Sequence, residues 1–388
     1  MIPRLLVVAG EASGDRAAAA VVSALRTRLS VEAFGMGGAA SQAAGVSLVH
    51  DLRSTTALGI GAVLARGHLL GLARSRLILA ARAKPRAAIP RACAALLVNY
   101  SEFNMSLAPR LHRMGVRVLW YGAPQIWAWR EGRADSLRRH IDKMAVMLPF
   151  EEPLWRGHGV DAEYVGHPAR ETTMLGRTEA RRALGLTDRA RTIAILPGSR
   201  PHEVHELLVP MLDAAERVRR DRASIDSRVL LAPSLDLGAR EFARTEAARR
   251  RVPTFDVDAS QGAGAMLSAF DVALTASGTA ALEATLARAV PVVAYRVGLA
   301  TELVARLLVR TPYYSLPNLL LDRGVFAELV QREVHARALA TAVARSLDRR
   351  TELLAACDAV EAVLGAERSP ARRVAEMLAP WLTGESRA

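Results

Sequence analysis

A corner in which glycine joins a short apolar run to a helical pattern occurs three times in this sequence, and this repeat constrains the fold most. The corners span residues 10–15 (GEASGD), 196–200 (LPGSR) and 276–279 (ASGT). Alternating strands and helices of this kind indicate parallel sheets with crossover helices. Ligands of open α/β sheets bind at the carboxyl ends of the strands, where these corners lie. We therefore expect an α/β protein that binds a phosphate-bearing ligand there.

The alternation of strand and helix runs through both halves of the chain. Its 388 residues, 51% of them apolar, exceed one ordinary core and suit two domains. We expect strands over 4–9, 34–38, 94–98, 116–121, 143–148, 162–165, 192–196, 228–232, 254–257, 271–275 and 291–295. Residues 38–56 show no clear pattern, and helices are expected to dominate after residue 301. Residues 166–177 contain glycine and proline and predict a linker between two Rossmann-like domains that face a cleft.

The charge of the chain is strongly positive and comes almost wholly from arginine. The net charge is +13, and Lys84 and Lys143 are the two lysines. This excess reflects either a GC-rich genome or attraction to anionic partners such as a membrane surface or a phosphorylated substrate. Zinc-finger spacings and basic segments interleaved with aromatics are absent from the sequence, which argues against nucleic acid as a partner.

The cysteine content and the hydropathy of the sequence indicate the cellular compartment in which the protein is expected. Cys93 and Cys357 are too few for a disulfide framework and show no metal-binding spacing, so a reducing cytoplasm is expected. Residues 1–4 lead directly into a strand without the apolar stretch of a signal peptide. No window reaches the roughly 18 apolar residues of a membrane span, so we expect a soluble or peripheral protein.

Residues 58–84 combine apolar and basic side chains in a helical pattern. Leucines and Ile60 alternate there with Arg66, Arg74, Arg82 and Lys84. Such a helix could lie in a membrane interface with its cations near anionic headgroups. The alternative is a helix that packs on the core and leaves its arginines in solvent. Both interpretations stay open on the residues alone.

The second corner has the composition of a phosphate site. Gly198 and Ser199 let backbone N–H groups approach an anion, and Pro201 is a favoured first residue of a helix. Arg200 could bind a diphosphate through two hydrogen bonds. Alternatively, the segment is a tight turn with the arginine in solvent, and Glu203 only complements the helix dipole.

The third corner suggests a nucleotide. Ser277, Gly278 and Thr279 open a helix, and Glu283 lies one turn further on the same face. A carboxylate there can accept both ribose hydroxyls while the helix start holds phosphates. The alternative makes Thr279 a helix cap and Glu283 a solvated side chain. Two such corners in one half favour the nucleotide interpretation.

A further candidate segment, residues 121–130 (YGAPQIWAWR), contains several large aromatic residues at the end of a strand. Loops that carry tryptophan and arginine often line binding sites, and Gln125 and Trp127 are candidates. Trp127 and Trp129 could equally fill a seam between the domains. His167 and His202 have no evident ligand partners, so no metal site is predicted.

Taken together, these segments resemble the lipid-A-disaccharide synthases, which are glycosyltransferases of the GT-B type with two Rossmann domains. The resemblance extends from Val7 to about Gln331. It rests on AGEASGD (9–15), PQIWAWR (124–130), LPFE (148–151), VGHP (165–168), LPGSR with Glu203 (196–203), ASGTAALE (276–283), VAYR (293–296) and YSLPNLL (314–320).

The resemblance implies an inverting reaction without an essential metal or cofactor. UDP-2,3-diacylglucosamine would donate its sugar to 2,3-diacylglucosamine 1-phosphate, giving UDP and the β-1,6-linked precursor of lipid A. Residues 1–168, joined by a C-terminal helix over 366–388, would bind the acceptor, and residues 169–365 would bind the UDP-sugar. Acylated substrates imply a cytoplasmic protein that is peripheral on the anionic inner membrane through residues 58–84. A homodimer stays open.

The resemblance also implies a set of site residues. Expected contacts to substrate or nucleotide are Gly10, Ser13, Gly14, Gln125, Trp127, Gly198, Ser199, Arg200, Glu203, Ser277, Gly278, Thr279, Glu283, Tyr295 and Asn318.

One motif departs from the family. Where the family reads IDAPDFN, this chain reads VNYSEFN over residues 98–104, so Asn99 replaces the aspartate proposed as the base. An amide cannot take up the acceptor's proton. Glu102, Asp15 or Glu11 could replace that base. The alternatives are a divergent paralogue with weak or lost activity, and another UDP-sugar enzyme of the same fold.

Overall fold

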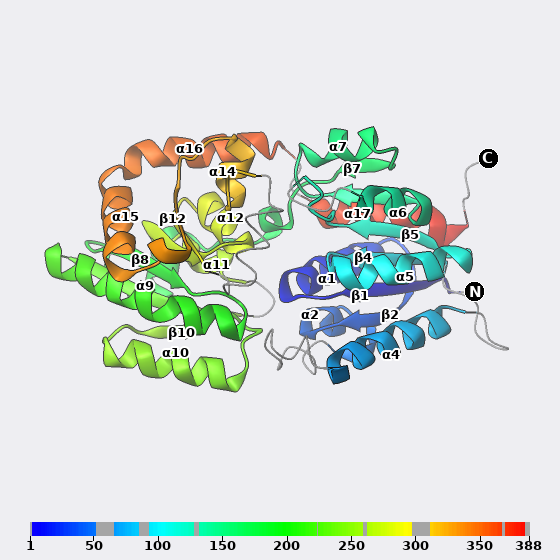
Figure 1. The fold of residues 1–388 in the computed structure, drawn as a ribbon, viewed down its shortest axis with the longest axis horizontal. Helices are drawn as coiled ribbons and strands as arrows, with labels where there is room; N and C mark the ends of the chain where they lie inside the picture. The colour runs from blue at the N-terminus through cyan, green and yellow to red at the C-terminus, as the bar shows by residue number, and fades with distance from the viewer. Residues whose placement is uncertain are drawn as a thin grey trace. The chain divides into compact units, whose positions relative to one another are not determined.

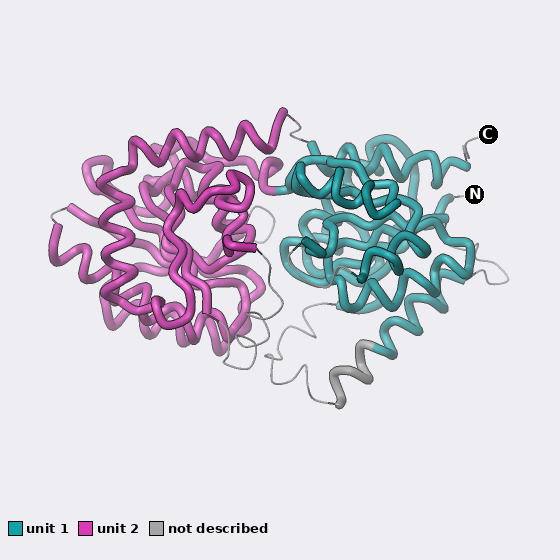
Figure 2. The backbone as a smooth tube through the Cα atoms, turned by 45° about the horizontal axis from the view of Figure 1, so that its top comes forward, with its two compact units in different colours: residues 1–168, 367–388 teal, residues 169–366 magenta. Residues whose placement is uncertain are grey.

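The computed structural model describes residues 2–51, 66–84, 93–127, 132–222, 224–258, 262–296, 311–366 and 369–384. It divides into two compact units (Figure 2). Unit 1 comprises residues 1–168 and 367–388, and unit 2 comprises residues 169–366. Each unit is built on one parallel sheet covered by helices, seven-stranded in unit 1 and six-stranded in unit 2. The expected α/β class with two Rossmann-like domains is thereby confirmed.

The sheet of unit 1 has the order β3-β2-β1-β4-β5-β6-β7, and all its described pairs are parallel. Its strands are β1 (Arg4–Ala9), β2 (Glu32–Gly37), β3 (Ser47–Asp51), β4 (Ala94–Val98), β5 (Arg117–Tyr121), β6 (Lys143–Val146) and β7 (Ala162–Tyr164). The strand β3 falls where the sequence predicts no element. Its side chains are half-buried or exposed at the sheet edge, so it lacks a continuous apolar run.

Helices cover both faces of this sheet because side chains alternate along each strand. Leu6 and Val8 face a core shared with α4 (Arg66–Ala83), α5 (Ser101–Arg113), α6 (Arg133–His140) and α7 (Glu151–Gly157). Leu5, Val7 and Ala9 face a second core shared with α1 (Ala12–Arg26) and α17 (Pro370–Thr383). The short helix α2 (Ala39–Ala43) follows β2.

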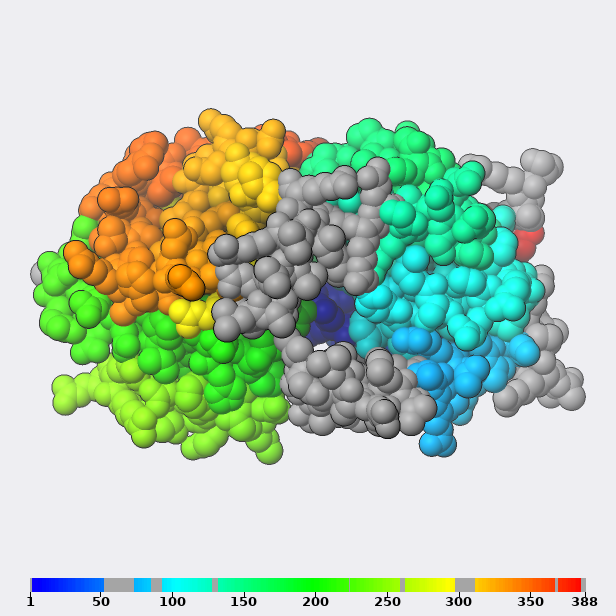
Figure 3. Space-filling view, viewed as in Figure 1, coloured from blue at the N-terminus to red at the C-terminus, as the bar shows by residue number. Residues whose placement is uncertain are grey.

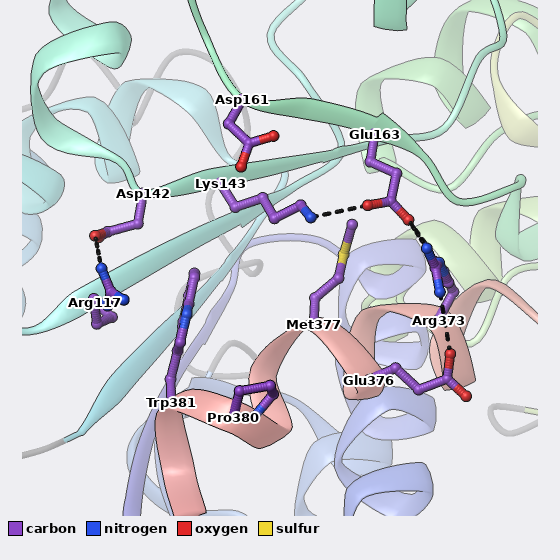
Figure 4. A pocket seen from close by; sticks show the side chains of 10 residues that line it. All are labelled: Arg117, Asp142, Lys143, Asp161, Glu163, Arg373, Glu376, Met377, Pro380 and Trp381. Atoms are coloured by element: carbon purple, nitrogen blue, oxygen red, sulfur yellow. Dashed lines mark hydrogen bonds and ion pairs between the residues drawn. The ribbon is translucent and has the colours of Figure 1, made fainter. Parts of the chain in front are cut away.

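The helix α17 belongs to unit 1 although it follows unit 2 in the chain. Its Val374 and Leu378 are fully buried in the core that α1 shares. Beside it, at the amino ends of β5, β6 and β7, lies a cavity of about 300 Å³ with charged walls (Figure 4). Arg373 donates to Glu163 at 2.6 Å, and Glu163 also pairs with Lys143 at 2.9 Å. Apolar packing and ion pairs together therefore hold α17 on the sheet.

The sheet of unit 2 has the order β10-β9-β8-β11-β12-β13. Its strands are β8 (Arg191–Leu196), β9 (Ile225–Leu231), β10 (Thr254–Asp256), β11 (Val272–Ala276), β12 (Val290–Tyr295) and β13 (Ala327–Val330). Its helices are α8 (Arg177–Ala183), α9 (Pro201–Asp221), α10 (Leu237–Arg249), α11 (Gly264–Leu267), α12 (Thr279–Leu286), α14 (Leu316–Leu321), α15 (Ala336–Asp348) and α16 (Arg350–Val363). The edge strand β13 lies in the region where only helices were expected to dominate.

Both sheets contain a switch point, where the order of strands reverses along the chain (Figure 1). In unit 1 it lies between β1 and β4, and in unit 2 between β8 and β11. Ligands of open α/β sheets bind outside the carboxyl ends of such strands. Because these strands are neighbours, the corner at 10–15 lies beside residues 99–102, and the corner at 197–200 lies beside residues 277–279.

The helix α4 differs from the amphipathic pattern that the sequence suggested. Leu79, Ala80 and Ala83 are buried, yet Leu77 is 60% exposed and Ile78 is 37% exposed, so apolar side chains lie on both sides. Residues 58–65 of the predicted segment lie outside the described residues. Within the part of the chain that the structure describes, no helix is long and apolar enough to cross a membrane.

Candidate active site

The unit 1 site is organised around two left-handed residues directly after β4. Asn99 has φ 48° and Tyr100 has φ 46°, a region that residues with a side chain rarely adopt and that is common at functional sites. Two hydrogen bonds hold this turn, from the Asn99 N–H to the Tyr121 carbonyl at 2.9 Å and from Asn104 Nδ2 to the Asn99 carbonyl at 2.8 Å. The turn is therefore fixed by its neighbours.

Glycines from two other motifs make room for these side chains. A Cβ atom at Gly10 would collide with the Tyr100 ring, and one at Gly122 would collide with Asn99 Oδ1. A Cβ atom at Gly14 would lie at ordinary contact distance, 3.6 Å, from Asn99 Nδ2. The corner at 10–15 and the turn at 99–100 thus fit against each other at the switch point.

The three candidate bases have different surroundings. Asp15 is buried and accepts N–H groups of Gly38 at 2.7 Å, Ala40 at 3.0 Å and Ser41 at 3.1 Å, so it anchors the start of α2. A carboxylate held in this way has a structural role, which corrects the expectation that it serves as a base. Glu102 is 66% exposed and forms an ion pair with Arg133. Glu11 is exposed, precedes α1, and its side chain does not cap that helix.

The remaining corner residues of unit 1 occupy the first turn of α1. Ser13 is half-buried there, and Gly14 is buried against β4. Their assignment as substrate contacts stays a prediction.

The tryptophan motif is anchored to the LPFE motif. Trp127 Nε1 donates to Glu151 Oε1 at 3.2 Å, and its ring meets Phe150 edge-on at 5.5 Å. Burial raises the pKa of Glu151 to about 7, although the hydrogen bonds from Trp127 and the Leu148 N–H oppose this rise. Gln125 is exposed, and Trp129 lies outside the described residues.

The second corner is filled by its own helix. Glu203 Oε2 accepts the N–H groups of Ser199 at 2.8 Å and Arg200 at 3.2 Å, and a Cβ atom at Gly198 would collide with Glu203. Gly198 has φ 123°, which glycine adopts readily. We expected these N–H groups to bind phosphate, but Glu203 already accepts them. The half-exposed Arg200 guanidinium also pairs with Glu203, at 3.1 Å.

The third corner begins its helix with a glycine. Gly278 is the N-cap residue of α12, and because glycine has no side chain it forms no side-chain cap. Thr279 is the first residue of the helix. The alternative with Thr279 as cap is therefore wrong. Glu283 is only 4% exposed and packs near Gly264, so it is not a solvated side chain. Ser277 Oγ donates to the Tyr314 carbonyl at 2.7 Å.

Aromatic side chains connect the two corners of unit 2. The rings of Tyr295 and Tyr314 lie 5.7 Å apart. Burial raises the pKa of Tyr295, while the nearby positive charge of Arg200 opposes the rise. Tyr295 therefore lies beside Arg200 at the carboxyl ends of β8 and β12.

Asn318 is placed differently from the expectation. Its Nδ2 donates to the Phe326 carbonyl and to Glu328, and its Oδ1 accepts the N–H groups of Val325 and Phe326, all at 2.8–3.0 Å. An amide has two donor hydrogens and two acceptor positions, so no capacity remains for a substrate. Asn318 closes the loop between α14 and β13, which corrects its assignment as a contact.

Several residues near the two sites were not on the predicted list. Tyr100 stood inside a quoted motif, and its place at a strand end was the available signal. Tyr314 likewise belonged to a quoted motif. Arg76 and Arg133, which surround Glu102 and Phe103, carry no local signal because their proximity depends on helix packing.

Comparison with known proteins finds relatives of the whole chain. The family described as Lipid-A-disaccharide synthetase matches residues 5–380. The lipid-A-disaccharide synthase of Anaeromyxobacter dehalogenans (strain 2CP-C) is 40% identical over 381 residues, which cover 97% of each chain. The S. aureus MnaA–UDP structure has a TM-score of 0.65 at 11% identity, covering 99% of this chain and 97% of that one. The spinosyn rhamnosyltransferase SpnG has a TM-score of 0.58 at 14% identity, covering 97% and 100%.

Proposed function

Because this chain belongs to the lipid-A-disaccharide synthase family, we propose that its two switch-point sites divide the work of one glycosyl transfer. The chain is a hexosyltransferase of the GT-B fold that forms the lipid A disaccharide precursor from a UDP-sugar donor and a sugar-phosphate acceptor. In our proposal unit 2 binds the donor and unit 1 binds the acceptor. The observation that carries it is the pairing of the family's motifs at each switch point. A non-catalytic paralogue is not favoured.

The donor's diphosphate is proposed to bind at the start of α12, with Arg200 beside it. The N–H groups at the start of a helix attract anions; the N-cap residue of α12 is Gly278, which has no side chain to cap the helix, whereas Glu203 accepts N–H groups at the start of α9. Gly278 keeps side-chain atoms away from the phosphates. Glu283 is proposed to accept the ribose hydroxyls, and Tyr295 lines the site. The binding of UDP by MnaA, a protein of similar fold, supports this choice of ligand.

The reaction is proposed to invert the anomeric carbon by in-line attack of the acceptor's 6-hydroxyl. The bond from that carbon to the diphosphate breaks as the new glycosidic bond forms. Negative charge then grows on the leaving UDP. Arg200 and the start of α12 stabilise this charge.

The proton of the attacking hydroxyl is proposed to pass to Glu11. Asn99 cannot accept it, and Asp15 is buried and accepts three N–H groups. Glu11 is the exposed carboxylate at the end of β1, beside Tyr100, whose pKa its negative charge helps to raise. This choice refines the expectation that named Glu102 or Asp15 first.

Association with the surface of the inner membrane is proposed to occur through α4. Leu77 and Ile78 are exposed apolar side chains on α4, and Arg74 and Arg82 on the same helix, with Lys84 directly after it, are exposed cations. This combination suits the boundary between acyl chains and anionic headgroups. The acylated substrates would meet the enzyme there, at the cytoplasmic face.

The proposal is tested by incubating the purified chain with both acylated sugars and measuring UDP and disaccharide. We expect equal amounts of the two products. UDP without disaccharide, or neither product, would contradict the proposed transfer. The companion variant Asn99→Asp should gain little, because Glu11 already serves as the base; a large gain would show that the wild type lacks one.

A further inference from the structure

Three helices of unit 1 form one continuous face, and each contributes an arginine to the same spot. The helices α4, α5 and α6 lie side by side in front of the sheet (Figure 1), and their surfaces adjoin in the space-filling view (Figure 3). Arg76, Arg110 and Arg133 are half-buried residues on these three helices. Partly buried guanidinium groups that converge from separate elements favour an anion between them.

The contacts of Arg133 and Arg76 lead to the first turn of α5. Arg133 Nη2 forms an ion pair with Glu102. The guanidinium of Arg76 lies 5.0 Å from the centre of the Phe103 ring. That ring stacks on Tyr100 at 5.3 Å, with 8° between the planes. Both arginines therefore lie next to the turn after β4.

Arg110 approaches the same place along α5. Its Nη1 donates to the Ser106 carbonyl at 2.5 Å, so the guanidinium extends back towards the start of the helix. Ser106 lies one turn from Glu102 on the same face. The charge of Arg110 reaches Arg76, whose pKa is lowered mainly by burial and partly by this second guanidinium.

The cluster has more positive than negative charge. Three guanidinium groups surround the carboxylate of Glu102, which is 66% exposed, and Tyr100 is neutral at physiological pH with a raised pKa. Among the described residues, the buried Nε atom of Arg76 has no hydrogen-bond partner. In the described part of the chain, the three guanidinium groups outnumber the two nearby carboxylates, Glu102 and Glu11, so the cluster attracts a further anion.

We propose that Arg76, Arg110 and Arg133 form the subsite for the phosphate group of the acceptor sugar. This inference rests on the proposed binding of the acceptor at the unit 1 switch point, which the cluster adjoins. A phosphate monoester carries about two negative charges near pH 7, and arginine binds it through paired hydrogen bonds. Glu102 is then a positioning residue that holds Arg133 in place, rather than the base.

An anionic lipid headgroup offers the same phosphate chemistry. The exposed side chains of α4 are proposed to face the membrane, so a headgroup could reach Arg76. The two sources differ in their consequences: an acceptor subsite affects discrimination between acceptors, whereas a headgroup site affects binding to vesicles.

The experiment compares two acceptors, 2,3-diacylglucosamine 1-phosphate and its dephosphorylated form, in mixed micelles with saturating donor. We measure the ratio of kcat/KM for the phosphorylated over the dephosphorylated acceptor. Arg76→Gln, Arg110→Gln and Arg133→Gln should each lower this ratio by about 10- to 100-fold, the effect of a lost charge-assisted hydrogen bond. Arg133→Lys, which keeps the charge, should recover part of it.

The matched control is Arg139→Gln, which removes an exposed arginine from α6 about 120° around the helix from Arg133. Its ratio should equal that of the wild type. UDP affinity by calorimetry should stay unchanged in every variant, and the tryptophan fluorescence of unit 1 should match that of the wild type, which shows that each variant has folded. A ratio that does not change in the three variants would overturn the subsite.

Two further outcomes separate the alternatives. If sedimentation with phosphatidylglycerol vesicles falls in the three variants while the ratio is unchanged, the cluster binds headgroups and the subsite is rejected. If the wild type converts neither acceptor, the proposed transfer is rejected and the acceptor subsite that rests on it is rejected with it.

Discussion

At both switch points the chain turns sharply after a strand through residues with positive φ, but the two units use different residue types for this turn. Unit 2 bends its chain at Gly198 and Gly278, with φ of 123° and 138°, where glycine meets no steric penalty. Unit 1 bends at Asn99 and Tyr100, whose left-handed conformations cost about 1–3 kcal/mol each. The turn in unit 2 thus uses residues that fit its backbone without strain, whereas the turn in unit 1 holds two side chains in a strained conformation.

The largest effect is expected from the proposed base in unit 1. Glu11→Gln keeps the shape and removes the proton acceptor, so kcat should fall by about 10²–10⁴-fold. Glu102→Gln is the matched comparison and should change mainly KM for the phosphorylated acceptor. The measurement is the pH profile of kcat for UDP release. If Glu102→Gln loses the basic limb and Glu11→Gln keeps it, the assignment is reversed.

In unit 2, the greatest loss is expected from Arg200→Ala. The leaving diphosphate would lose a charge partner, which should lower kcat by about 10²–10³-fold. The control is Arg217→Ala, which removes an exposed arginine from the same helix α9. Steady-state kinetics with the UDP-sugar check this expectation. Unchanged kinetics for Arg200→Ala would place charge stabilisation elsewhere.

A pH effect on stability is expected in unit 1. The pKa of Glu151 is raised from 4.5 to about 7, so the native state holds a proton that the unfolded state releases between these values. Stability from this group is fully present below pH 4.5 and is lost as pH rises through 7. The loss amounts to about 3 kcal/mol. Glu151→Gln is neutral throughout and should lack this dependence.

Tryptophan fluorescence can report this effect for unit 1 alone. All five tryptophans, at positions 120, 127, 129, 155 and 381, belong to unit 1. Urea titrations at pH 5 and pH 8 should therefore give a larger difference for the wild type than for Glu151→Gln. Equal differences in the two proteins would show that Glu151 is ionised at both pH values.

The smallest effect is expected from glycine substitutions, which contrast the two corners directly. Gly10→Ala should destabilise unit 1 by about 1–3 kcal/mol, because the new methyl group collides with the Tyr100 ring. Tyr100→Ala in that background should restore stability. Gly278→Ala meets no atom within 4 Å, so its cost of about 1–2 kcal/mol comes from the backbone alone. Urea titrations followed by circular dichroism measure both; a Gly10→Ala defect that Tyr100→Ala cannot relieve would exclude the collision.

Much of the fold could be predicted because central strands of parallel sheets are continuous apolar runs. The strands β1, β4, β8, β11 and β12 are almost wholly buried, and their predicted positions agree with the structure to within one residue. The missed strands β3 and β13 are edge strands with half-buried, partly polar residues. Their existence depends on the neighbouring strand more than on their own sequence.

The site was predictable in outline and not in its contacts. Motif spacing located the corners, because strand ends at a switch point must meet. Residue type could not reveal that Asp15 anchors α2 or that Glu203 caps α9, since both depend on backbone N–H groups placed by the fold. The arginines around Glu102 come from three helices, so no single segment of sequence records their convergence.

The return of α17 to unit 1 has a consequence for biosynthesis. Val374, Leu378 and other side chains of α17 complete a core whose remaining residues all lie before position 166, and all of unit 2 is translated between the two parts. A nascent chain that has just finished residue 168 therefore carries an unfilled apolar slot beside α1. An exposed apolar surface of this kind promotes aggregation or chaperone binding until α17 has been synthesised and packs against it. The half of the molecule made first is thus the half that matures last.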